Sequence, residues 1–414
     1  MLQIARSEAA ARLNGKEPPL VEQPPALNCE VCVIVPVRDE AKTLEATLTA
    51  LAEQVDLDGN SVERDRYEVI VLANNCSDNS AAIARRFARR SALVLHVVEV
   101  MLEAEYAYIG WVRKRLMDEA YRRLAQLGRA QKHSPGIIAS TDGDTQVTPT
   151  WIATILQEIQ RGADAVGGRI LTNPRERAAL DRVTRLYFLR YVGYRSLVAQ
   201  LEAILDPVPY DPIPRHHQHF GANLAVTAAT YAQVGGLPSV RTPEDVAFYQ
   251  ALTRADARFR HSPDVQVITS ARVVGRIQDG LAGRLTQLAR LGHAHQPMLV
   301  ESAALVETRY WVRRQLRLLW QRRDTTSVHP PLAQALSLTT DWLREAIAQS
   351  PTFGWLVEHI AQQQPERDYY LQHWPLVPIQ EAIAELRLIK AARADDSLES
   401  LEQIKPILLV APPI

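Results

Sequence analysis

Two carboxylates separated by one glycine follow an apolar run in the first half of the chain. Asp142 and Asp144 stand at positions i and i+2, with Gly143 between them. Carboxylates suit Mg²⁺ and Mn²⁺, which in enzymes share their coordination shell with phosphate oxygens and water, and glycine lets the backbone approach a ligand closely. The spacing therefore predicts a site for a divalent cation and a diphosphate, with an ordinary Asp-Gly turn as the alternative.

A second acidic pair opens a segment with the pattern of a helix. Glu244 and Asp245 follow Pro243, and residues 246–255 carry the apolar periodicity of a helix. A carboxylate at a helix N-terminus stays ionised readily, because the helix dipole favours negative charge there. Facing a bound sugar donor, it would take the proton of an attacking hydroxyl, so this pair supplies candidate general bases. Plain helix capping is the alternative.

The elements that must position these carboxylates are visible as an alternation of strand and helix patterns. Apolar, β-branched runs indicate strands covered on both faces: VCVIVPV (31–37), YEVIVLA (67–73), ALVLHVVEV (92–100) and GIIAST (136–141). Helical patterns lie between them: 38–54, with Asp39 as the expected cap, 81–90 and 108–128. The alternation predicts an α/β fold with a doubly wound, mostly parallel sheet.

Ligands bind such sheets at the carboxyl ends of the strands. Three polar loops fall at this edge, namely 38–40, 74–80 and 142–145. The sequence contains neither GxGxxG after the first strand nor GxxxxGK[ST]. Binding of NAD or ATP through those two motifs is therefore excluded.

Five segments together carry a family pattern: VIVPVRDE (33–40), VIVLANNCSDNS (69–80), DGD (142–144), GANLAVTAATYAQVGGLP (221–238) and EDVAFYQAL (244–252). In order and spacing they resemble the family 2 glycosyltransferases, and the resemblance extends from residue 30 to residue 280. It implies a GT-A-type fold and an enzyme that moves a sugar from a nucleotide diphosphate donor.

The resemblance also implies roles for individual residues. Donor contacts would come from Pro36, Val37, Arg38, Glu40, Asn74, Asn75, Asp78, Gly110, Arg113, Asp142 and Gly143. Asp142 would contact the ribose and Asp144 the metal. Asp245 would be the base of an inverting displacement at the anomeric carbon, with Glu244 as the neighbouring candidate.

Some positions depart from the family pattern. Many members carry two aspartates where this chain has Ala73 and Asn74, and the second usually recognises uracil. An asparagine both accepts and donates, so UDP is favoured while another base stays open. For the family's further metal ligand or phosphate contact, the candidates are His261 as a metal ligand, and Arg272 and Arg276 as bidentate clamps of the diphosphate. A surface arginine at a strand end is the alternative.

The run Arg215-His216-His217-Gln218-His219 allows three interpretations. Adjacent histidines in an extended segment point to opposite sides, which disfavours zinc. A loop that lines the acceptor pocket or a solvated loop remains. Candidate acceptor or phosphate contacts are therefore His219 and, within the following family segment, Gly221 and Asn223.

Composition restricts the partners and the compartment. The chain has 414 residues, and 47 basic residues balance 47 acidic ones, so no overall field attracts nucleic acid. Three cysteines cannot form a disulfide framework, and the sequence shows neither a signal-like start nor an apolar stretch long enough for a membrane span. We expect a cytoplasmic protein.

Three regions are expected along the chain: a flexible tail over 1–28, a glycosyltransferase domain over 29–280 and a helical extension over 281–414, with breaks near 329–331, 350–354 and 374–378. Residues 309–323 combine six arginines with Val312, Leu316, Leu319 and Trp320 at helical spacing. Such a helix either lies on an anionic membrane, which would place the protein at the inner membrane surface, or packs on the protein with its arginines in solvent. A homo-oligomer is left open.

The function that follows is a metal-dependent inverting glycosyltransferase, using Mn²⁺ or Mg²⁺, a nucleotide-sugar donor (UDP favoured) and a hydroxyl acceptor. Alternatives are a retaining GT-A transferase, a nucleotidyltransferase, or a non-catalytic protein of the same fold that binds nucleotide sugars. The intact Asp142, Asp144 and Asp245 favour turnover, while the sequence names neither the sugar nor the acceptor.

Overall fold

An interior strand of the main sheet is built from seven buried residues, β1 (Val31–Val37). It pairs in parallel with β2 (Tyr67–Asn74) on one side and β6 (Ile137–Ser140) on the other. The computed structural model describes residues 18–131, 134–272, 280–393 and 405–411. These strands coincide with the apolar runs of the sequence, so the prediction of a parallel sheet is confirmed.

The chain divides into two units. The first comprises Met1–Arg177, Gln218–Leu252 and Ala257–Arg272, and the second comprises Ala178–His217, Thr253–Asp256 and Val273–Ile414. Helix α7 (Arg182–Leu205) therefore belongs to the second unit, although it lies within the predicted glycosyltransferase domain in sequence. The boundaries expected at 28 and 280 stay predictions.

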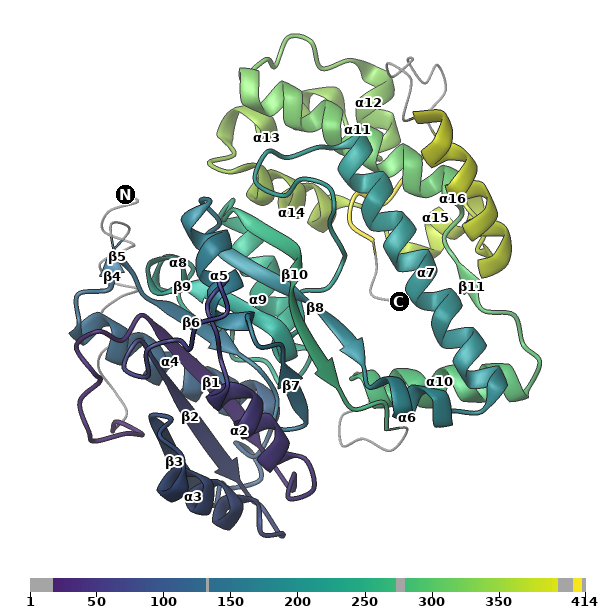
Figure 1. Cartoon of the computed structure of the whole chain (residues 1–414). Helices are drawn as coiled ribbons and strands as arrows, with labels where there is room; N and C mark the ends of the chain where they lie inside the picture. The colour runs from purple at the N-terminus through teal and green to yellow at the C-terminus, as the bar shows by residue number, and fades with distance from the viewer. Residues whose placement is uncertain (1–17, 132–133, 273–279, 394–404, 412–414) are drawn as a thin grey trace. The chain divides into compact units, whose positions relative to one another are not determined.

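The first unit is an eight-stranded sheet in the order β3-β2-β1-β6-β9-β8-β10-β7 (Figure 1). Its other strands are β3 (Leu95–Val100), β7 (Thr145–Val147), β8 (Ala165–Thr172), β9 (Leu224–Thr227) and β10 (Phe259–Thr269). β9 runs antiparallel between β6 and β8, and β7 runs antiparallel to β10. The remaining pairings are parallel. A separate hairpin joins β4 (Ala130–Gln131) and β5 (Ser134–Pro135).

Helices cover both faces of the sheet. They are α2 (Leu44–Ala52), α3 (Ser80–Arg90), α4 (Ile109–Gln126), α5 (Trp151–Gln160), α8 (Ala228–Gln233) and α9 (Glu244–Arg254), with α6 (Pro174–Ala179) at the unit boundary. Alternate residues of β1 enter two cores: Val33 packs with α2, α3 and α5, while Ile34 packs with α4, α8 and α9. This is the doubly wound α/β arrangement expected for a GT-A-type domain.

One local expectation is wrong. Asp39 does not cap α2, because the helix begins at Leu44 with Thr43 at the N-cap position. Asp39 instead has a positive φ of 51° and accepts a hydrogen bond from the Ser77 backbone. Its carboxylate joins two loops and does not cap a helix.

Part of the expected tail is packed. Val21 is buried and belongs to the core that contains α4, and the Gln23 carbonyl accepts a hydrogen bond from Arg123. The Glu119 carboxylate accepts from the backbone of Leu20 and Val21. Residues 18–23 therefore lie along α4, and residues 1–17 are outside the described part of the chain.

The second unit is helical, as expected for the C-terminal extension. Its other elements are α10 (Leu281–His293), β11 (Leu299–Val300), α11 (Ala303–Arg322), α12 (Pro330–Ala335), α13 (Thr340–Gln349), α14 (Phe353–Gln363), α15 (Arg367–His373), β12 (Val377–Pro378) and α16 (Ile379–Arg393). The gaps between successive helices lie near the predicted breaks. One core gathers α7, α10, α11 and α16, and another gathers α11 to α14. None of the described helices combines the length and low polarity needed to cross a bilayer.

The basic segment 309–323 forms most of α11 and is packed. Val312 and Leu316 are fully buried, and Arg309 is buried in an ion pair with Glu301. Arg313 pairs with Glu202 of α7, and both Arg313 and Arg317 pair with Asp206. The packing alternative therefore describes this helix, with three of its arginines paired rather than solvated.

Candidate active site

The loop that carries Asp142 and Asp144 is fastened to the beginning of α2. The Gly143 carbonyl accepts hydrogen bonds from the hydroxyls of Thr47, at 3.1 Å, and Thr43, at 3.3 Å. A Cβ at Gly143 would lie 3.1 Å from Val37 and 3.2 Å from Glu40. Glycine thus allows the loops after β1 and β6 to meet at the carboxyl edge of the sheet.

Arg113 of α4 lies at the centre of the site and is buried. Its guanidinium donates to Glu244 at 2.9 Å, to Asp142 at 3.0 Å, and to the Ser140 hydroxyl at 2.6 Å. Burial alone would lower the pKa of Arg113, but the carboxylates of Asp142 and Glu244 outweigh it and raise that pKa. The predicted donor contact is therefore a side chain that faces protein groups and joins the DGD loop to α9.

The peptide of Gly221 connects this network to Asp245. Its carbonyl accepts from Arg113, at 2.9 Å, and from Ser140, at 2.7 Å. Its N–H donates to Asp245 Oδ2 at 2.9 Å. A Cβ at Gly221 would lie only 2.4 Å from the guanidinium carbon of Arg113, so glycine is required for this approach.

The two adjacent candidate bases have different surroundings. Glu244 is 4% exposed and paired with Arg113, and burial raises the pKa of Glu244 despite that partner. Asp245 is partly exposed, and its second oxygen accepts from the Val246 backbone. The geometry leaves Asp245 as the carboxylate that solvent or a substrate reaches.

A positive charge lies between two carboxylates on the other side of the DGD loop. Arg272 makes a bidentate contact with Glu40, at 2.9 and 3.0 Å, and reaches Asp144 Oδ2 at 3.0 Å. Burial, followed by the charges of Asp142 and Glu40, raises the pKa of Asp144 to about 6. The space between Glu40 and Asp144 therefore favours a positive charge, and the guanidinium of Arg272 occupies it.

These residues fit a divalent metal in the chemistry of their donors. Glu40, Asp142 and Asp144 offer carboxylate oxygens, which Mg²⁺ and Mn²⁺ prefer. Among the described residues, however, the three potential ligands that lie within 4.8 Å of one another are Asp39, Cys76 and Asp78.

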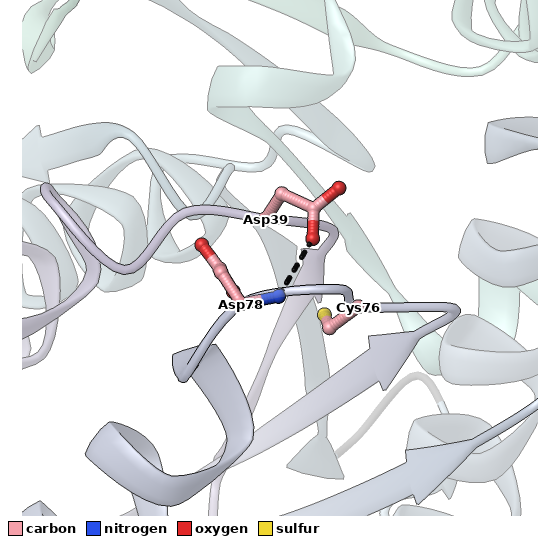
Figure 2. Close-up of side chains that lie close together, drawn as sticks. All are labelled: Asp39, Cys76 and Asp78. Carbon is pink, nitrogen blue, oxygen red and sulfur yellow. Dashed lines mark hydrogen bonds between the residues drawn. The ribbon is translucent and has the colours of Figure 1, made fainter.

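The Asp39, Cys76 and Asp78 group joins two loops. Figure 2 shows Asp39, after β1, accepting a hydrogen bond from the Asp78 backbone, after β2. The hydrogen bond from the Ser77 backbone N–H lowers the pKa of Asp39. Burial raises the pKa of the Cys76 thiol. Asp78 in turn accepts from Ala41 and Ser80. These bonds explain the cluster without a ligand.

The other predicted donor residues lie around the ends of β1 and β2. Pro36 and Val37 are buried in β1, Arg38 is exposed and donates to the Ala107 carbonyl, and Asn74 is buried at the end of β2. The Asn75 amide exchanges two hydrogen bonds with the Leu102 backbone.

Gly110 is fixed by packing. A Cβ there would lie 1.9 Å from the Val240 carbonyl oxygen, which belongs to the loop before α9. Gly110 thus lets α4 approach the segment that leads to Glu244 and Asp245.

The structure does not bring His261 to Asp144. His261 pairs in register with Gly167 of β8, whereas Thr269, whose partner Thr145 follows Asp144, pairs with Thr172. Gly167 and Thr172 are five positions apart on β8, about 16 Å of extended strand. His261 lies instead in an aromatic cluster in which His219 stacks on Tyr249 at 4.0 Å.

The remaining candidates divide similarly. Asn223 is buried, accepts from Trp151 and donates to the carbonyls of Arg169 and Val265, so it fastens the sheet. Arg276 lies outside the described residues. Sequence reasoning did not single out Ser140 and Thr47, whose hydroxyls hold the Gly221 and Gly143 carbonyls. A serine at the end of a buried strand was the available signal for Ser140.

The fold is a GT-A-type α/β domain, and carboxylates of the loops after β1 and β6 and of the start of α9 gather at the carboxyl edge of its sheet. Residues 32–210 match the family model of Glycosyl transferase family 2. Glycosyltransferase AglE of Haloferax volcanii is 28% identical over 155 residues, which cover 37% of this chain and 43% of AglE. The chain therefore spans less than half the length of this curated relative.

Further similar chains are found among solved structures. Mannosyltransferase PcManGT from Pyrobaculum calidifontis, in complex with GDP-Man and Mn²⁺, is 19% identical, with 95% of this chain and 91% of that chain covered and a TM-score of 0.39. S. aureus TarS 1-349 in complex with UDP is 12% identical, with 82% and 93% covered and a TM-score of 0.41.

Proposed function

We propose that this protein is a metal-dependent inverting glycosyltransferase that moves a sugar from a nucleotide diphosphate to a hydroxyl acceptor. The observation that carries the proposal is the linkage through Gly221. Its N–H orients the accessible Asp245 carboxylate, while its carbonyl is held by Arg113, which also binds Asp142 of the DGD loop. A candidate base and a candidate donor loop are thereby held by one buried side chain.

Asp245 performs the proton transfer in this proposal. With Oδ2 fixed by the Gly221 N–H, the carboxylate takes the proton of the acceptor hydroxyl as that oxygen bonds to the anomeric carbon. The bond between that carbon and the nucleoside diphosphate breaks on the opposite face, which inverts the configuration. Arg113 neutralises Glu244, so the neighbouring carboxylate does not compete for the proton.

Glu40, Asp142 and Asp144 would hold the metal, and Arg272 would accompany the diphosphate. A bound Mn²⁺ or Mg²⁺ supplies positive charge that stabilises the departing diphosphate. Arg272 already lies beside the same carboxylates and is able to donate two parallel hydrogen bonds to phosphate oxygens. We expect Asn74 to form hydrogen bonds with the base of the donor nucleotide, for which UDP is favoured.

The first test is nucleotide binding. We expect UDP to raise the melting temperature in the presence of Mn²⁺ more than GDP, CDP or ADP, because a ligand at 100 times its Kd stabilises by about 2.7 kcal/mol. Excess EDTA should abolish the effect, since the diphosphate is repelled by Asp142 and Asp144 until a cation lies between them. Unchanged UDP affinity in EDTA would contradict the metal requirement, and a larger shift with GDP would reassign the base.

A second arm tests the metal position without any nucleotide. Replacing Arg272 with glutamine removes the cation that pairs with Glu40 and Asp144, so calorimetric titration should show tighter Mn²⁺ binding. Asp144→Asn should weaken it. Equal Mn²⁺ affinity in wild type and both variants would place the metal elsewhere. Stereochemistry then follows by NMR of the first-formed product once a donor and acceptor are found.

A further inference from the structure

The first half of α7 exposes aliphatic side chains on one side. Leu186, Leu189 and Val192 are 44%, 51% and 38% exposed. Their spacing of three residues places them along one face of the helix. On the opposite side, Thr184, Phe188 and Tyr194 are buried. The core of the second unit therefore buries only some of the apolar side chains of α7.

The same face carries positive charge. Arg182, Arg185 and Arg190 follow the exposed aliphatic residues around the helix, and residues 182–201 contain no acidic residue. None of these three arginines forms an ion pair with a residue that the structure describes. This contrasts with Arg313 and Arg317 of α11, which are paired with Glu202 and Asp206.

Helix α10 extends this basic region. It packs against the first half of α7 (Figure 1). Gly292 lies close to Val183, and Arg284 lies over the ring of Tyr191. Residues 281–300 contain Arg284 and Arg290 and no acidic residue. Asp181, the N-cap of α7, pairs with His293 of α10.

We propose that the α7 face, defined as Arg182, Arg185, Leu186, Leu189, Arg190 and Val192, docks on an anionic lipid membrane. Exposed aliphatic residues bordered by arginines match a surface with apolar chains beneath negative headgroups. A second copy of the chain would oppose the same positive charge, which disfavours self-association through this face. The proposal concerns the second unit and is independent of the proposed transferase activity.

The experiment is flotation of the full chain with lipid vesicles. We expect binding to vesicles of equal parts phosphatidylglycerol and phosphatidylcholine at low salt, with little binding to phosphatidylcholine alone and a marked decrease in high salt. Replacing Arg182 and Arg190 with glutamine should weaken the partition by about fivefold per arginine. The pair Leu186→Ser and Leu189→Ser should weaken it by about tenfold.

Matched controls separate the α7 face from general effects. Leu388→Ser alters a leucine of the same unit that is 72% exposed, and Arg86→Gln with Arg89→Gln alters exposed arginines of α3. Both should bind vesicles as wild type does, and circular dichroism and melting temperature should show that every variant is folded. The proposal is overturned if wild type does not float, or if the α7 variants and the controls bind equally. Concentration-dependent dimers that Leu186→Ser and Leu189→Ser dissolve, without vesicle binding, would assign the face to a second copy instead.

Discussion

At the residue scale, the contrast between Glu244 and Asp245 shows how position selects chemistry. Both carboxylates open α9, yet only Asp245 combines partial exposure with a hydrogen bond from the Gly221 N–H. Glu244 is buried beside Arg113, and its carboxylate balances the charge of that guanidinium. The two therefore differ in what a substitution should do.

Asp245→Asn is expected to separate binding from turnover. The amide keeps the size of the side chain, and its oxygen still accepts from Gly221, but it no longer takes a proton. Nucleotide affinity by calorimetry should persist while the transfer rate falls by a factor of about 10² to 10⁴.

Glu244→Gln supplies the comparison, because it leaves the buried Arg113 without that carboxylate and should lower the melting temperature. Normal transfer by Asp245→Asn together with inactive but folded Glu244→Gln would make Glu244 the base. If both variants transfer normally, the inverting mechanism assigned to α9 is wrong.

Sequence reasoning identified the residue types of the site better than their partners. Asp142, Asp144 and Asp245 have recognisable spacing, whereas the expectation that Arg113 contacts the donor could not reveal its burial. That burial depends on Ser140 and Gly221, which are distant in sequence and meet only when β6 and β9 pair. His261 was linked to the metal by residue type, and only strand register shows its separation from Asp144.

At the element scale, the approach of α4 to the loop before α9 depends on Gly110. Gly110→Ala would place a Cβ 1.9 Å from a backbone oxygen, so one of the two segments must move. We expect a loss of about 1–3 kcal/mol in the free energy of unfolding, measured with urea, together with reduced turnover, because the moved segment leads to Asp245.

The control is Gly193→Ala in α7, where an added Cβ meets nothing within 4 Å. Alanine is favoured over glycine inside a helix by up to about 1 kcal/mol, so this variant should be as stable as wild type or more stable. Destabilisation of both variants to the same extent would show that the contact with Val240 is unimportant.

The elements themselves were predictable where one face is clearly apolar or a strand is buried on both sides. Helix α7 was not identified, because its apolar residues are not confined to one side of the helix. One side faces α10, α11 and α16, while Leu186 and Leu189 remain exposed. A helix of this kind gives no clean periodic stripe.

At the scale of the whole molecule, the second unit is assembled from separate stretches of chain. Its core combines α7 with α10, α11 and α16, which follow the strand β10 of the first unit in sequence. Composition along the sequence indicates a change of character near residue 280, but it carries no information on which earlier helix joins the later ones.

The stability of the first unit should depend on a buried ion cluster that joins several elements. Glu68 of β2 accepts hydrogen bonds from Arg123 of α4, and from His96 of β3 in the tautomer that has its hydrogen on Nε2. Arg123 also donates to the Gln23 carbonyl. Burial would raise the pKa of Glu68, but the hydrogen bonds from Arg123 and His96 prevail and lower it from 4.5 to about 2.

This lowered pKa predicts a defined loss of stability in acid. The folded state binds the Glu68 proton less tightly than the unfolded state, so the stabilisation is complete above pH 4.5 and disappears as the pH falls toward 2. Its size corresponds to about 3 kcal/mol. Urea unfolding should give a steeper loss of free energy between pH 5 and pH 3 in wild type than in Glu68→Gln, which should be less stable at pH 7 because Arg123 stays buried without its carboxylate. Glu63→Gln, at an exposed position, should follow the wild-type curve. Parallel curves for wild type and Glu68→Gln would show that other carboxylates govern acid unfolding and that the cluster does not couple β2, β3 and α4.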